Sequence, residues 1–257
     1  MSRNSQKDLK RRENKKMGIS FTFEGYTTLI DSLKDIGYIF TDYHSYEKYP
    51  RCVILRHDID NSIEKALAIA KLEYELGVKS TFFTLLRTDF YNPASKRGLS
   101  GLKNIRSLGH EVGLHFDEMA YYKIDDVVKA IKNEASILSD ILEAPITTVS
   151  MHRPSQKTLD SNYDLTPMIN SYGKTFFNDF KYLSDSRRRW REPTLEIIKS
   201  GQYDRLHILT HPIWYQETEE SIHDTIKRFI TSANKERYYQ ESENIKDIES
   251  ILDINEI

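Results

Sequence analysis

The chain has 257 residues, of which 39% are hydrophobic and 30% charged, enough to bury one sizeable core. Its formal net charge of -2 provides no overall positive field, which argues against nucleic acid as a partner. Residues 1–17 are the exception, because they carry seven Lys and Arg and few apolar side chains. This composition predicts a disordered tail, with a phosphate- or membrane-binding tail as the alternative.

The single cysteine, Cys52, stands inside an apolar run, where a small buried side chain in a strand is expected. A lone cysteine excludes an internal disulfide and fits a reducing compartment. No apolar run approaches the length of a membrane span, and no signal-peptide core follows the basic start. We therefore expect a cytoplasmic protein without a transmembrane segment, which would meet a surface polysaccharide as a precursor.

Helical and strand periods of apolar side chains alternate along the sequence. In chain order, the pattern predicts a helix at 24–37, a strand at 52–56, a helix at 62–76 capped by Asn61, a strand at 80–86, a helix at 101–108, a strand at 111–115, a helix at 124–142, a strand at 146–150, a weaker strand at 174–178, a helix at 194–200, a strand at 205–210 and a helix at 218–233. Strands separated by helices pair in parallel through right-handed crossovers. The order predicts an α/β fold with a closed or nearly closed barrel, with a doubly wound open sheet as the alternative.

The barrel domain is expected at 18–235, followed by an acidic C-terminal helix or tail at 236–257. Within that tail, Ile245, Ile248 and Leu252 lie at helical spacing. The segment is therefore expected to dock on the barrel, or on a second chain to form an oligomer.

Four predicted strands end in side chains that bind metals or transfer protons. These ends are the runs HDID at 57–60, HFD at 115–117, HRP at 152–154 and HP at 211–212. In parallel α/β barrels the C-terminal strand ends form one face, where active sites are built. The four segments are therefore expected to converge.

Asp58 and Asp60 are two residues apart, so in a continuing strand both side chains point to the same side. One carboxylate can hold a divalent cation while the other acts as a base on water. The alternative is an Asp-rich turn in which Asp60 or Asn61 caps the next helix. Capping does not explain why Asp58 ends an apolar strand.

The histidines have structural alternatives of their own. His115 is either a metal ligand or a buried core histidine, and His211 is either a general acid for a departing amine or a turn residue. His110 is expected to bond backbone in a turn. Asp117 is a candidate ligand, helix cap or hydrogen-bond partner of His115.

In order, these segments resemble the motifs of the polysaccharide deacetylases with the NodB-homology domain, carbohydrate esterase family 4. The resemblance rests on LRHDID at 55–60, GHEVGLH at 109–115, the Arg153-Pro154 pair and LTHP at 209–212. It implies a distorted (β/α)7 barrel and one divalent metal, most often zinc, with cobalt, nickel or manganese as alternatives. Carried over by position, the roles are base for Asp58, metal ligand for Asp60 and His115, acid for His211, and orientation of the base for Arg153.

The sequence departs from the family at Met119, where the second ligand histidine usually stands four residues after the first. Thioether sulfur is a poor ligand for a hard or borderline cation. His152 is the leading candidate for the third ligand, followed by Asp117 and His57.

A further segment, YLSDS at 182–186 with Trp190 and Arg191, resembles a subfamily associated with surface-polysaccharide and lipopolysaccharide biosynthesis. In that interpretation Asp185, Trp190 and Arg191 shape the substrate pocket. The arginines at 187–189 form either a solvated loop or a contact to the phosphates of a nucleotide- or lipid-linked sugar.

The sequence therefore predicts a metal-dependent hydrolase that removes an N-acetyl or N-formyl group from a sugar or polysaccharide precursor. One alternative is a non-catalytic saccharide-binding barrel, motivated by Met119. Another is hydrolysis of a different non-peptide C–N amide bond. No Gly-x-Ser-x-Gly elbow and no Walker or dinucleotide-binding loop occurs in the sequence.

Overall fold

The computed structural model describes residues 18–257, so the prediction for the basic tail at 1–17 lies outside the described residues. The described chain forms two compact units, one up to Glu217 and one at Thr218–Ile257. The second unit contains α9 (Ile222–Ser242), which runs without interruption through the domain boundary predicted at 235, and two short 3-10 turns. No helix within residues 18–257 is both long and apolar enough to cross a membrane.

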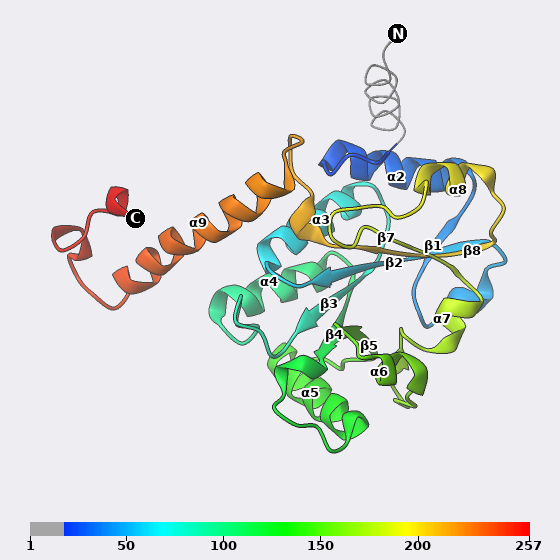
Figure 1. Ribbon diagram of the computed structural model, residues 1–257, viewed down its shortest axis with the longest axis horizontal. Coiled ribbons are helices and arrows are strands. Elements are labelled where there is room, and N and C mark those ends of the chain that lie inside the picture. The colour runs from blue at the N-terminus through cyan, green and yellow to red at the C-terminus, as the bar shows by residue number, and fades with distance from the viewer. Residues whose placement is uncertain (1–17) are drawn as a thin grey trace, which may run out of the picture. The chain divides into compact units, whose positions relative to one another are not determined.

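The first unit is built on a parallel sheet with helices between successive strands (Figure 1). Its strands are β1 (Ile39–Thr41), β2 (Cys52–Ile59), β3 (Thr81–Leu85), β4 (Glu111–Asp117), β5 (Thr148–His152), β6 (Ile169–Asn170), β7 (Lys181–Ser184) and β8 (Arg205–Thr210). Its α-helices are α2 (Phe23–Asp35), α3 (Ile63–Glu75), α4 (Lys96–Ser107), α5 (Val127–Leu142), α6 (Gln156–Ser161), α7 (Lys174–Asn178) and α8 (Thr194–Ser200).

The strand order is β6-β5-β4-β3-β2-β8-β7, and β1 pairs with the first half of β2. The sheet curls into a half-barrel in which all of these pairings are parallel. Its two edges are the short strands β6 and β7, so the barrel stays open between them. The predicted α/β class and distorted barrel are confirmed.

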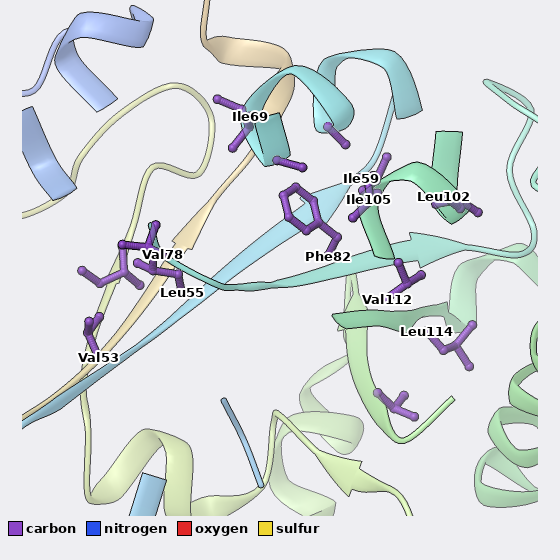
Figure 2. Packing of buried hydrophobic residues seen from close by; sticks show 14 of the residues in the cluster. Val53, Leu55, Ile59, Ile69, Val78, Phe82, Leu102, Ile105, Val112 and Leu114 are labelled. Carbon is purple, nitrogen blue, oxygen red and sulfur yellow. The ribbon is translucent and has the colours of Figure 1, made fainter. Parts of the chain in front are cut away.

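Successive residues of β2 face opposite sides of the sheet, and this alternation divides the core in two. Val53, Leu55 and Ile59 belong to the main cluster, which fills the space between the sheet and helices such as α3 and α4 (Figure 2). Cys52 and Ile54 belong to a smaller cluster together with aromatic side chains from other segments. The functional side chains described below follow the same alternation.

Some predicted elements differ from the structure. Helix α3 is capped by Ser62 rather than Asn61, because the Ser62 hydroxyl accepts a hydrogen bond from the backbone N–H of Lys65 at 3.2 Å. Helix α4 starts several residues earlier than predicted, after Ser95.

The weak strand predicted at 174–178 is wrong, because these residues form the short helix α7. Phe176 on α7 and Phe180, which follows the helix, are both buried in the smaller cluster. Strands β1, β6 and β7 have no more than four residues each, too few for a clear alternation of apolar side chains.

The smaller cluster surrounds His207, whose stability contribution depends on pH. Burial, with a smaller effect of Arg56, lowers the pKa of His207 from 6.5 to about 3. Between these values the unfolded chain binds a proton that the folded chain excludes, so stability falls as the pH falls. From pH 7.5 to pH 5, His207 is expected to lower the free energy of unfolding by up to about 2 kcal/mol.

Urea unfolding of the wild type and of His207→Gln at both pH values measures this contribution. The variant is expected to lose less stability between them, whereas His223→Gln, at an exposed position, should behave like the wild type. Equal pH dependence of the wild type and His207→Gln would contradict the assignment.

Candidate metal centre

The four strand ends singled out in the sequence meet at one place. Asp58 lies on β2, His115 on β4, His152 at the end of β5, and His211 directly after β8. With Asp60, they line one cavity of about 310 Å³ at the C-terminal ends of the strands. The structure thus brings together side chains that are up to 153 residues apart, counting from 58 to 211.

Asp60, His115 and His152 form a group whose donor atoms all lie within 4.8 Å of one another. Asp60 Oδ1 is 3.3 Å from His115 Nε2 and 3.4 Å from His152 Nδ1. Bonds of 2.0–2.2 Å to one tetrahedral ion place neighbouring ligand atoms roughly 3.3–3.6 Å apart. The two measured distances agree with that geometry.

Two of these residues, Asp60 and His115, have atoms that lack the hydrogen bonds that buried polar groups normally form. Asp60 Oδ1 and both ring nitrogens of His115 are buried and form no hydrogen bond with other described residues. Leaving such atoms unpaired is costly, and a bound ion is one of the explanations for an exception. One carboxylate and two imidazoles also match the ligand types of a catalytic zinc site, so the residues present fit a divalent metal.

Asp58 is held by a fully buried arginine. Arg56 donates from Nε to Asp58 Oδ1 at 3.0 Å and from Nη2 to Asp58 Oδ2 at 2.7 Å. Burial raises the pKa of Asp58, but Arg56 and His115 outweigh it and hold the pKa well below its usual range. The carboxylate is therefore ionised, with its Oδ2 atom 3.5 Å from His115 Nε2.

The sequence assigned the orientation of Asp58 to Arg153, and the structure corrects this. Arg153 has a positive φ of 46° and forms an ion pair with Asp117. Arg56 takes the role because it lies two residues before Asp58 on the same side of β2. The sequence did contain a sign of this role, because Arg56 is a charged residue at the end of the apolar run 52–55.

His211 is fixed by a buried carboxylate. Its Nδ1 atom is 2.6 Å from Asp185 Oδ1, and its backbone N–H donates to the same carboxylate. Tyr215 donates to Asp185 Oδ2 at 3.1 Å. Burial alone would lower the pKa of His211, but the ion pair and hydrogen bond with Asp185 raise it to about 9. His211 is therefore cationic at neutral pH, and its Nε2 atom faces Asp60 Oδ2 at 3.8 Å.

This placement corrects the predicted role of Asp185. Its side chain is fully buried, so it holds His211 and does not form an open pocket wall. Trp190 packs against the main core, whereas Arg191 is exposed and lines a second cavity next to the first. The sequence analysis gave Asp185, Trp190 and Arg191 the same role in the substrate pocket, whereas the structure gives each a different position.

The alternative ligands are engaged elsewhere. His57 faces the outside of β2, where it bonds Glu73 at 3.0 Å and Thr210 at 2.7 Å. Asp117 pairs with Arg153 and caps the turn at Met119. Met119 itself is 65% exposed and does not line the cavity.

His110 has the structural position expected for it. Its Nε2 atom lies 2.9 Å from the backbone carbonyl of Ala70, and its Nδ1 atom accepts from the backbone N–H of Ser80. It therefore ties α3 to the entrance of β3 and stays outside the cavity.

The Arg56–Asp58 pair is expected to matter for stability as well as for geometry. Arg56→Met leaves the Asp58 carboxylate buried without its counter-ion and should lower the free energy of unfolding by about 3–5 kcal/mol. Combining it with Asp58→Asn removes the unpaired charge, so the double variant should be more stable than Arg56→Met alone. Chemical denaturation of both variants checks this, and equal instability would show that the charge pair is not the cause.

No family model and no curated protein matches the chain. Solved structures do match it. A polysaccharide deacetylase from Bacillus cereus is 14% identical with a TM-score of 0.45, and the match covers 72% of this chain and 88% of that one. A family 4 acetyl xylan esterase from Clostridium thermocellum with a cobalt ion is 14% identical, TM-score 0.40, over 72% and 84%.

A mutant carbohydrate esterase family 4 pseudoenzyme with restored activity is 16% identical, with a TM-score of 0.44. That match covers 73% of this chain and 64% of the other, so the chain spans less than two thirds of its length. These structures are from the family that the sequence motifs resemble. With identities of 14–16% and TM-scores below 0.5, the function has to be inferred from the site.

Proposed function

We propose that this protein is a metal-dependent hydrolase that removes an acyl group from an amino sugar or a related saccharide. The observation that carries the proposal is the convergence of Asp60, His115 and His152, with unpaired buried atoms, beside an ionised Asp58 and a cationic His211. Metal ligands, a base and an acid are the components of metal-assisted amide hydrolysis.

Asp60, His115 and His152 would hold the ion, and the mixed oxygen and nitrogen ligands favour zinc. When bound, the metal supplies Lewis acidity, polarising the acyl carbonyl and increasing the acidity of the attacking water. Three protein ligands leave a coordination position open for this chemistry. The remaining work falls to the protein's own side chains.

Asp58 is positioned to accept the proton of the attacking water. Its two bonds to Arg56 fix the carboxylate plane, and its Oδ2 atom faces the ligand group. The depressed pKa keeps Asp58 ionised, so it is in the form that a base requires.

His211 is positioned to give a proton to the departing nitrogen. Asp185 fixes the ring through Nδ1 and leaves Nε2 directed at the cavity. An amine is a poor leaving group unless it is protonated, and a cationic imidazole beside the cavity meets that need. This requirement favours an N-acyl bond, such as N-acetyl or N-formyl.

A saccharide suits the cavity walls. Tyr172, Tyr182 and Trp214 line the cavity together with the polar residues of the candidate centre. Aromatic faces pack against the C–H faces of sugar rings, while polar tips remain available for hydroxyl groups.

A non-catalytic barrel was suggested by Met119, and the position of that residue weakens the suggestion. Met119 is exposed on a turn after β4, and His152 from β5 completes a group of three ligands without it. The catalytic interpretation is therefore favoured.

Metal content tests the ligand group. His152→Ala is expected to lower the bound metal from about one ion per chain by tenfold or more at limiting metal, because one of three ligands is lost. Elemental analysis after gel filtration measures this, with Met119→Ala as the matched control. Metal should also raise the melting temperature of the wild type, and a chelator should reverse the shift. Full metal content in His152→Ala would rule out this ligand assignment.

Acyl release tests the base. Asp58→Asn is expected to lower kcat by about 10²–10⁴-fold, since general base catalysis contributes that much. Acetate and formate released from N-acylated amino sugars are measured for the wild type, for this variant and for the exposed control Asp125→Asn. The metal content of Asp58→Asn is measured in parallel, so that loss of the base is distinguished from loss of the ion. Full activity in Asp58→Asn would refute the mechanism.

A further inference from the structure

A second cavity of about 410 Å³ adjoins the candidate metal centre. Tyr172, Tyr182 and Ser186 line both cavities, so the two cavities adjoin along these residues. Both volumes lie within the range of small-molecule binding sites. A substrate held at the ligand group therefore has room to extend into the second cavity.

Three aromatic rings line this second space. Phe177 lies between Tyr172 and Tyr182, with ring centroids 5.3 Å and 5.1 Å away. Both tyrosines are backed by buried side chains: Tyr172 by Arg56 at 5.0 Å and Tyr182 by His207 at 5.4 Å. Phe177 is 39% exposed, an apolar surface of the kind that accepts a ring of a ligand.

The carboxylates of the two cavities are already accounted for. Asp58 is paired with Arg56, and Asp60 belongs to the ligand group. In the second cavity Glu192 accepts from Lys181 Nζ at 2.6 Å. None of these carboxylates pairs with an arginine that lines either cavity.

Two guanidinium groups that line the cavities have no charged partner among residues 18–257. Arg153 is paired with Asp117, but Arg187 in the first cavity and Arg191 in the second form no ion pair or side-chain hydrogen bond with other residues of 18–257. Both are exposed, and Ser186 next to Arg187 lines the junction of the two cavities. Guanidinium groups bind phosphate and carboxylate through paired hydrogen bonds.

The backbone at Arg187 supports a functional placement. Arg187 and Arg188 both have a positive φ, of 60° and 55°. This backbone conformation is sterically unfavourable for residues other than glycine. Such conformations cluster at binding sites, where the fold holds a side chain in a required direction.

We propose that the substrate carries a phosphate or carboxylate group on the unit next to the acylated sugar, bound between Arg187 and Arg191, with that unit packed on Phe177. This proposal rests on the proposed function for the position of the acylated sugar. It narrows the substrate to an anionic saccharide, either a phosphate-linked sugar or one adjacent to a uronic acid.

The test is calorimetric binding to the full-length wild-type protein freed of metal with a chelator, so that no probe is consumed. UDP-N-acetylglucosamine represents the phosphate source, a hyaluronan disaccharide the carboxylate source, and di-N-acetylchitobiose the neutral saccharide. At least one anionic probe should bind tenfold or more tightly than the neutral one, and increasing salt should weaken its binding.

The combined Arg187→Gln and Arg191→Gln substitutions should weaken anionic binding by tenfold or more and leave neutral binding unchanged. Arg189→Gln is the matched control, since this exposed arginine of the same segment lines neither cavity. Phe177→Ala should weaken binding of the anionic probe without changing its salt dependence. Equal affinity for all three probes, no binding of either anionic probe, or no effect of the arginine substitutions would overturn the proposal.

Acyl release by the wild type, measured separately, distinguishes the two proposals. Arginine-dependent binding without any acyl release would retain the anion site and reject the hydrolase. Acyl release from neutral and anionic saccharides at equal rates, independent of both arginines, would retain the hydrolase and reject the anion site.

Discussion

The buried guanidinium of Arg56 is the constraint on which the interior of the half-barrel depends. Arg56 is the bulkiest of the fully buried side chains among residues 18–257, and a charge in that position needs partners on every side. Asp58 supplies the counter-charge, Ser150 and Ser171 accept further hydrogen bonds, and two aromatic rings lie within 5.2 Å of the guanidinium. These partners come from β2, β3, β5 and the segment after β6. The guanidinium therefore ties together β2 and β5, two of the strands that carry the candidate site.

The outer face of β2 carries a second buried network. His57 bonds Glu73 on α3 and Thr210 at the end of β8. Tyr26 and Ser80 donate to the same Glu73 carboxylate at 2.6 Å and 2.5 Å. His57 and Thr210 directly precede Asp58 and His211. The network therefore holds the ends of β2 and β8 in register from the side of the sheet that faces away from the cavity. It explains why a polar residue interrupts the apolar outer side of β2 without entering the cavity.

The sequence showed which strand ends carry candidate residues, but it did not show the edges of the sheet. Strand-end positions identified Asp58, Asp60 and His115 because a long buried strand followed by polar residues is visible in one dimension. The roles of Arg56 and Asp185 were missed or misassigned because their partners are set by pairing between distant strands. A short strand such as β6, with two residues, owes its conformation to its neighbour β5 and carries no periodic signal of its own.

His152, the proposed third ligand, shows how strand pairing can replace a local motif. Parallel pairing sets Asp117, two residues after His115, opposite His152 on β5. Side chains on one side of adjacent strands are near neighbours, so the end of β5 reaches the space beside His115 as readily as the turn after β4. The chain after Asp117 turns away and leaves Met119 exposed, while the last residue of β5 points its imidazole at Asp60. Because His152 is the last residue of β5, the sheet itself holds its imidazole in place. A ligand at position 119 would instead depend on the turn after β4.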